Sequence, residues 1–198
     1  MSQDELGAVI SRNVGDLEQA ITHVQENMDP KINSAAWDAL EQALRDEDFH
    51  FDDGEDPDSR WFAPRAWLIE EDSDPWFELS VRDGDDLETW LASYCAPRSE
   101  KEAMGIQWHN DNLYVRDYKA ILEEYADDLK AIELAGFRRD GNDIYLPIDF
   151  DSEAIAEGFG QGDLKDAMRP IAAAVKVLID TLPHFQKLRD AIVAKATA

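Results

Sequence analysis

The sequence predicts an α+β fold, in which a mainly antiparallel sheet of about four to six strands carries amphipathic helices on its faces. Apolar residues recur at helical spacing near both ends of the chain, and they alternate with polar residues in the middle. The connections between the expected strands are short, which is typical of antiparallel neighbours. We expect a single domain over residues 1–198, because a chain of this length can bury one core.

The N-terminal segment, residues 1–45, is predicted to be a helical hairpin. Its first helix, over residues 4–28, carries apolar residues at 4-3-4-3-4 spacing: Ile10, Val14, Leu17, Ile21, Val24 and Met28. We expect Pro30 to end this helix. The second helix, over residues 33–45, would be capped by Asn33 or Ser34 and would present an apolar face made of Trp37, Leu40 and Leu44.

The seam of the first helix has two interpretations. We expect it to pack on the protein's own sheet, because most amphipathic helices bury their apolar face in this way. A homodimer through residues 10–28 is the alternative, since the spacing spans almost three heptads.

Residues 46–59 are predicted to form an acidic loop. Gly54 and Pro57 favour a turn, and the carboxylates crowd together: Asp46, Glu47, Asp48, Asp52, Asp53, Glu55, Asp56 and Asp58. An EF-hand needs glycine at its sixth position, and placing Gly54 there puts Phe49 and Phe51 at ligand positions. The specific calcium motif therefore fails, which leaves a solvated loop or weak, unspecific binding of divalent cations.

Residues 60–150 are predicted to hold the sheet and one helix. The strand candidates are 60–70, 76–82, 88–95 and 105–109, followed by a hairpin at 137–139 and 144–146. Within 76–82, one face would carry Phe77, Leu79 and Val81, and the other would carry Trp76, Glu78, Ser80 and Arg82. The helix over 115–135 is expected to stop at Gly136.

The C-terminal segment, residues 151–198, is predicted to be helical. Asp151 or Ser152 would cap a short helix to about residue 157, followed by a flexible connector over 158–162. The glycines of this connector resemble a phosphate-binding loop only superficially, because no strand precedes them. Two helices complete the chain, one over 163–181 and one from Pro183 to about 195.

The charge of the chain limits its partners. The formal net charge is −25, and residues 1–100 hold 26 of the 44 acidic residues but only 7 of the 19 basic ones, a net charge of −19. Such a surface repels DNA, RNA and anionic lipid, so we expect neither direct nucleic-acid binding nor membrane binding. It favours a basic protein partner, unless the charge serves only for solvation.

Cysteine content and the N-terminal sequence favour the cytoplasm. Cys95 is the only cysteine, so an internal disulfide bond is excluded, and we expect its thiol to be buried and inert in a strand. Residues 1–5 show neither the basic nor the apolar region of a secretory signal.

The familiar catalytic motifs are absent from the sequence. A restriction-type nuclease needs a lysine two residues after its strand glutamate, and Ser80 occupies that position after Glu78. The histidines lack ligand spacing, and His109 is the best single acid–base candidate. Asp149 and Asp151 could hold a divalent cation, but Asp151 also suits a helix cap. We expect no cofactor.

These observations favour a non-catalytic acidic protein that binds a basic partner, either as an inhibitor or as a mimic of nucleic-acid charge. The expected contact residues are Asp52, Asp53, Glu55, Asp56, Asp58, Trp76 and Arg82. The tryptophans either form an exposed aromatic surface on the sheet that contacts the partner, or they are buried in the hydrophobic core. One alternative function is a metal-dependent hydrolase that uses Glu78, Asp149 and Asp151. The other is a self-associating structural protein.

Overall fold

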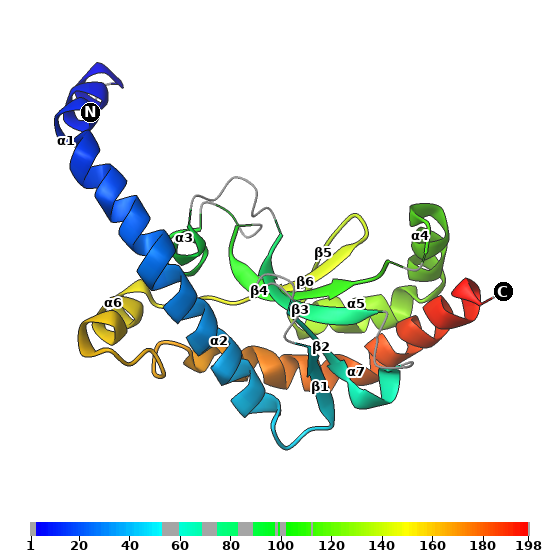
Figure 1. Cartoon of the computed structure of the whole chain (residues 1–198). Coiled ribbons are helices and arrows are strands. Elements are labelled where there is room, and N and C mark those ends of the chain that lie inside the picture. The colour runs from blue at the N-terminus through cyan, green and yellow to red at the C-terminus, as the bar shows by residue number, and fades with distance from the viewer. Residues whose placement is uncertain are drawn as a thin grey trace.

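The computed structural model describes residues 3–52, 60–68, 75–82, 89–97, 99, 102–111 and 113–197. Its centre is an antiparallel sheet of six strands in the order β1-β2-β3-β4-β6-β5, which confirms the predicted α+β fold (Figure 1). The strands are β1 (Phe49–Asp52), β2 (Trp61–Pro64), β3 (Trp76–Val81), β4 (Met104–His109), β5 (Arg138–Asp140) and β6 (Asp143–Pro147).

The described helices lie at the two ends of the chain and between the strands. They are α1 (Gln3–His23), α2 (Asp29–Leu44), α3 (Trp90–Cys95), α4 (Val115–Glu124), α5 (Ala126–Ala135), α6 (Ser152–Gln161) and α7 (Arg169–Ala196). A π-helical turn, Val24–Met28, joins α1 to α2, and a 3₁₀ turn, Arg65–Trp67, follows β2. None of these helices is long and apolar enough to cross a membrane.

The alternation predicted for β3 is confirmed and divides the sheet into two faces. Phe77, Leu79 and Val81 are buried, whereas the residues between them are half-buried. Directly paired residues share a face, so β4 adds to the buried face the partners Trp108, Ile106 and Met104. The apolar face lies against helices, while the opposite face is polar.

Helix α7 supplies the centre of the core. Phe185 is fully buried, and its ring centroid lies 4.9 Å from that of Trp108 and 5.1 Å from those of Phe77 and Phe137. The helix also contacts α2, α4 and α5. Helices from both ends of the chain therefore meet over the same sheet face.

The predicted N-terminal hairpin is wrong, because α1, the π turn and α2 form one long helical run over residues 3–44 (Figure 1). In the π turn the Asp29 amide donates to the Val24 carbonyl. The helix-forming pattern then starts again, and Pro30 occupies the beginning of α2, where a proline needs no amide partner. Asn33 and Ser34 lie inside α2 and cap nothing, whereas Trp37, Leu40 and Leu44 are buried as predicted.

The predicted strand over 88–95 is also wrong, since Trp90–Cys95 forms helix α3. The buried carboxylate of Asp29 accepts hydrogen bonds from the amides of Trp90 (3.0 Å) and Leu91 (2.7 Å). These bonds satisfy donors at the helix N-terminus. The aromatic residues of this segment favour a strand locally. The partner that decides for a helix, Asp29, lies about sixty residues earlier in the sequence, so the local pattern does not reveal it.

Four further boundaries differ from prediction. Strand β1 lies inside the predicted acidic loop, and the helix over 115–135 breaks at Tyr125. Helix α6 includes most of the predicted 158–162 connector and ends at Gly162, where φ is 73°. Helix α7 continues through Pro183, because packing on both sides of that residue outweighs one lost hydrogen bond.

The β-hairpin predicted at residues 137–139 and 144–146 is confirmed, and so are two of the predicted helix ends. Strands β5 and β6 pair from Arg138 with Tyr145 to Asp140 with Asp143. Gly136 ends α5 with a φ of 126°, a value that favours glycine. Asp151 caps α6 by accepting from the Glu153 amide at 2.9 Å.

Candidate functional site

The polar face of the sheet is the first candidate site. We use this name for the half-buried and buried polar and aromatic side chains opposite the core: Trp76, Glu78 and Ser80 on β3, Arg82 directly after β3, Gln107 and His109 on β4, Tyr145 on β6, and His50, Asp52 and Trp61 on β1 and β2. The strand register places them on one side, because directly paired residues share a face.

Glu78 is the centre of this face. Its carboxylate accepts from Trp76 Nε1 at 3.0 Å and from Ser80 Oγ at 3.4 Å, and it lies 3.2 Å from His109 Nε2. The rings of Trp76 and His109 stack with centroids 5.7 Å apart. Burial would raise the pKa of Glu78, but the bonds and charge from His109, with those from Trp76 and Ser80, outweigh it and lower that pKa. Glu78 is therefore ionised at neutral pH.

Arg82 is engaged within the protein. Its Nη2 donates to Asp140 at 3.1 Å and to Asp143 at 3.0 Å, and its guanidinium lies 4.2 Å from the centroid of the Tyr145 ring. Only 8% of the side chain is exposed. Burial would lower the pKa of Arg82, but the two carboxylates outweigh it and raise that pKa. Arg82 thus ties β3 to the β5–β6 hairpin and presents little charge to solvent.

Asp52 stands at the edge of the polar face. It pairs with Trp61 across β1 and β2, and the Trp61 ring lies 5.3 Å from the ring of His50. Of the seven contact residues predicted from sequence, the structure brings Asp52, Trp76 and Arg82 onto this one face. The others, Asp53, Glu55, Asp56 and Asp58, lie outside the described residues, so their role stays a prediction.

Sequence reasoning missed the Glu78–His109 pair. Each residue was singled out alone, as a nuclease-like glutamate and as an acid–base candidate. The register that pairs Trp76 with His109 places the histidine diagonally beside Glu78. The alternation of β3 and β4 could have placed both on the polar face, but the sequence does not give the relative register of the two strands.

The structure gives Asp151, one of the two predicted metal ligands, a local structural role. Asp151 caps α6, and Asp149 lies two residues before it, ahead of the helix. Among the residues that the structure describes, no three histidine, cysteine or carboxylate side chains form a group that could hold a metal ion. Cys95 is half-buried at the end of α3, not in a strand, and burial raises the pKa of its thiol.

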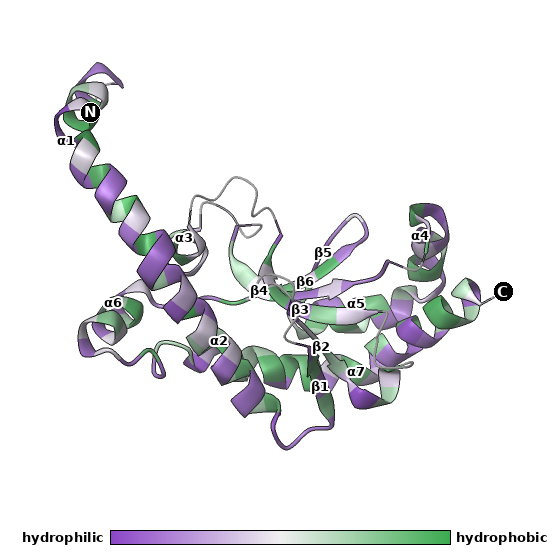
Figure 2. Ribbon diagram, in the orientation of Figure 1, coloured by the Kyte–Doolittle hydropathy of each residue, from purple (hydrophilic) through white to green (hydrophobic). Residues whose placement is uncertain are grey.

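A second candidate surface is the α1 stripe, which we define as the exposed apolar side chains of α1: Leu6, Val9, Ile10, Val14, Leu17 and Ile21. Figure 2 shows hydrophobic positions (green) recurring among hydrophilic ones (purple) along α1. Each is 43–49% exposed, and no residue of α1 is buried. The helix projects from the body of the protein (Figure 1). The expectation that this seam packs on the protein's own sheet is therefore wrong.

Helix α1 is poorly stabilised by itself. It contains Gly7 and Gly15, each of which costs about 1 kcal/mol relative to alanine inside a helix. Asn13 also departs from helical geometry, with φ −122° and ψ 15°. Covering the exposed half of each stripe residue would contribute on the order of 1 kcal/mol. Among the described residues, the stripe holds most of the exposed large apolar side chains, so covering it would stabilise the protein.

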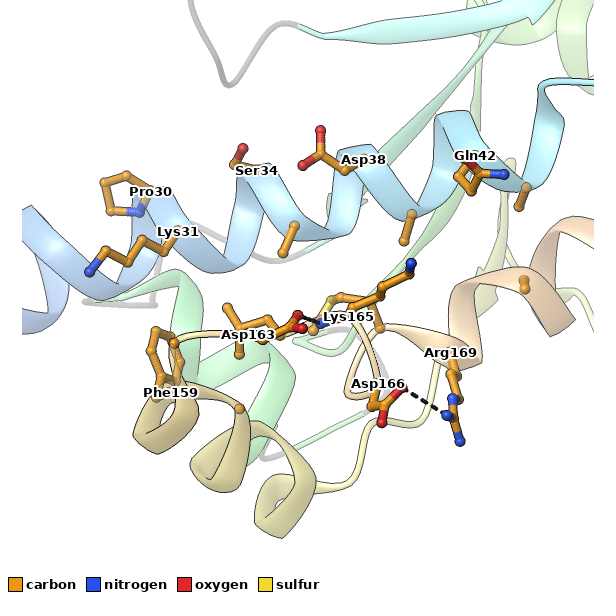
Figure 3. A pocket seen from close by; sticks show the side chains of 18 residues that line it. Pro30, Lys31, Ser34, Asp38, Gln42, Phe159, Asp163, Lys165, Asp166 and Arg169 are labelled. Carbon is orange, nitrogen blue, oxygen red and sulfur yellow. Dashed lines mark hydrogen bonds and ion pairs between the residues drawn. The ribbon is translucent and has the colours of Figure 1, made fainter.

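The third candidate surface is a groove of about 1200 Å³ between α2 and the α6–α7 connection, which we name the α2–α6 groove (Figure 3). The α2 wall presents the small side chains of Ala35, Ala39 and Ala43. The opposite wall includes Phe159, Leu164 and Met168. Lys31 and Asp38 lie on the α2 wall, and Arg169 is paired with Asp166 at 2.7 Å on the other side. The groove therefore has an apolar floor and charges of both signs along its walls.

Comparison with protein-family models finds no matching family, and searches of curated proteins and of solved structures find no match either. The functional conclusions below therefore depend on the three surfaces and on charge alone.

Proposed function

We propose that the protein binds a basic partner protein through the anionic surface of its N-terminal half and has no catalytic activity of its own. The net charge of −19 over residues 1–100 carries this proposal. Charge of that density attracts cationic proteins and speeds their association, and it does so best at low salt. Inhibition of a basic effector and imitation of nucleic-acid charge are the two forms that this function would take.

The polar face of the sheet supports the proposal. It combines the ionised Glu78 with the half-buried indole of Trp76, and aromatic rings attract the cationic groups of lysine and arginine. The charge of Arg82 is offset by Asp140 and Asp143, so it does not repel a basic partner. Asp52 connects this face in sequence to the other predicted contact carboxylates.

The test uses a fluorescent lysine-rich peptide as a stand-in for the basic partner. We expect it to bind the full chain at low salt and to lose affinity steeply as salt is added, because exposed charges are screened over about 8 Å at physiological ionic strength. Converting five carboxylates to amides should weaken binding about tenfold or more, since each exposed ion pair contributes roughly 0.2–1 kcal/mol. The five are Asp52, Asp53, Glu55, Asp56 and Asp58.

A matched control removes the same charge elsewhere. Its five changes are Glu123→Gln, Glu124→Gln, Glu133→Gln, Glu157→Gln and Asp180→Asn, all at exposed helical positions. We expect this variant to keep most of the affinity. Equal losses of affinity in both variants would show that net charge, and not the position of these five carboxylates, determines binding. Binding whose affinity does not change with salt, or no binding at all, would contradict the proposal.

A further inference from the structure

The α1 stripe and the α2–α6 groove complement each other in the spacing of their side chains. Three large residues of the stripe, Leu6, Ile10 and Val14, recur every four positions on α1, and the alanines of the groove recur every four positions on α2. If the two helices run antiparallel, each of these three large side chains meets a small one: Leu6 with Ala43, Ile10 with Ala39, and Val14 with Ala35. Such pairing allows two helices to approach closely.

The same antiparallel register matches the remaining positions. Gly7 falls opposite Gln42, and Gly15 falls opposite Ser34, so the missing side chains on α1 leave room for the larger polar ones on α2. Apart from adjacent residues of α1 itself, no atom of the described residues lies within 4 Å of a Cβ placed at either glycine. The folded single chain therefore gives no steric reason for glycine at these two positions.

Charge and size are also compatible. In this register Glu18 lies opposite Lys31, and the groove lining holds three basic residues, Lys31, Lys165 and Arg169, together with three acidic ones, Asp38, Asp163 and Asp166. Helix α1 brings four acidic residues, Asp4, Glu5, Asp16 and Glu18. About ten residues of helix fill a cylinder about 10 Å wide and about 15 Å long, close to the groove volume of about 1200 Å³.

We propose that α1 of one copy of the chain lies in the α2–α6 groove of a second copy, and that the two copies exchange these helices about a two-fold axis near Val24 and Gln25. A chain cannot fill its own groove in this way, because α1 continues through the π turn into α2 and points away from the groove (Figure 1). Two-fold symmetry forms the contact twice, so one dimer covers both stripes and both grooves. This proposal does not depend on the proposed partner.

Disulfide crosslinking of the full chain tests the register directly. In a Cys95→Ser background, Ile10→Cys combined with Ala39→Cys should form a covalent dimer on oxidation, with residue 10 of one copy linked to residue 39 of the other. The single variants Ile10→Cys and Ala39→Cys serve as controls and should stay uncrosslinked, because equivalent residues lie far apart in the antiparallel pair. Digestion and mass spectrometry identify which cysteines are joined.

The crosslink outcomes separate the alternatives. A link from residue 10 to residue 10 would overturn the proposal in favour of a parallel coiled coil through residues 10–28. A link from 10 to 39 within one chain would show that α1 folds back at the π turn, which also contradicts the exchange. A chain that forms no specific link and sediments as a monomer at high concentration would contradict any dimer.

Sedimentation of groove variants gives a second readout. Ala39→Arg fills the groove and should weaken dimerisation at least tenfold, whereas Ala173→Arg, an exposed alanine of α7 outside the groove, should change it less than twofold. Leu17→Asp with Ile21→Asp should also produce monomers. Both residues are exposed in the single chain, so the near-ultraviolet circular dichroism of the core aromatic residues should be unchanged. Unimpaired dimerisation of Ala39→Arg would overturn the groove as the docking site.

Discussion

Helices α1 and α7 are both long and amphipathic, but they lie in opposite environments. Helix α7 spans 28 residues and buries eight of them against the sheet and its neighbouring helices. Helix α1 spans 21 residues and buries none. The apolar spacing of each helix predicts a covered face, and only the folded chain shows whether the cover comes from the same molecule. An unused face on one of two such helices therefore points to assembly.

The largest expected difference between the two helices is in core packing. Phe185→Ala should lower the free energy of unfolding by about 3–5 kcal/mol, because it opens a cavity among Phe77, Trp108 and Phe137. Leu17→Ala in α1 should change it by less than about 0.5 kcal/mol in dilute solution. Urea denaturation followed by tryptophan fluorescence measures both. Similar losses would mean that α1 packs on the body in solution.

A smaller loss of stability is expected at Asp29, where the long helical run over residues 3–44 first becomes buried. Asp29 is its first buried residue, and Asp29→Ala removes the acceptor for two amides of α3. We expect a loss of about 1–3 kcal/mol in the free energy of unfolding. Asp38→Ala, on the exposed side of the same helix, is the control and should cost less than about 0.5 kcal/mol. Equal costs would show that the cap contributes nothing specific.

The smallest expected effect comes from the polar contact that joins α7 to α5. Asp128 lies 2.6 Å from Lys187 Nζ and 2.7 Å from His184 Nδ1, and these bonds lower the pKa of Asp128. Its contribution is therefore complete above the ordinary aspartate pKa and is lost as the pH falls through the lowered value. Asp128→Asn should cost about 0.5–1 kcal/mol at neutral pH, because Lys187 is largely exposed.

The pH dependence provides the check on this last effect. Urea titrations of the wild-type chain and of Asp128→Asn should approach each other as the pH falls below the ordinary aspartate pKa, and should converge only below the lowered pKa of Asp128, where the wild-type carboxyl is also neutral in the folded protein. Glu133→Gln, an exposed carboxylate on α5, should follow the wild-type curve throughout. A constant gap between Asp128→Asn and wild type at all pH values would point to packing instead of charge.

The sequence predicted those elements whose signals are local. Alternation in β3, the stop at Gly136 and the cap at Asp151 depend on residues within a few positions of each other, and all three are confirmed. The errors arose where a distant contact decides the conformation. Hydrogen bonds from two amides to Asp29 stabilise Trp90–Cys95 as a helix, and packing on both sides of Pro183 keeps α7 helical at that residue.

The candidate sites show the same division. The polar side of β3 follows from its alternation, but the approach of His109 to Glu78 depends on a strand register that the sequence does not state. The α2–α6 groove depends on how the α6–α7 connection passes α2, and no local pattern encodes that geometry. The α1 seam was visible in the sequence, whereas its exposure was not.

The two outer strands of the sheet also affect how the molecules behave at high concentration. Strand β1 is four residues long and ends in Asp52, and β5 consists of three exposed charged residues, Arg138, Arg139 and Asp140. Short edge strands and charged edge residues discourage the backbone pairing by which flat sheets grow into fibrils. We therefore expect the β5 margin, which is charged throughout, to resist such pairing more strongly than the β1 margin, where Phe49 and Phe51 accompany Asp52.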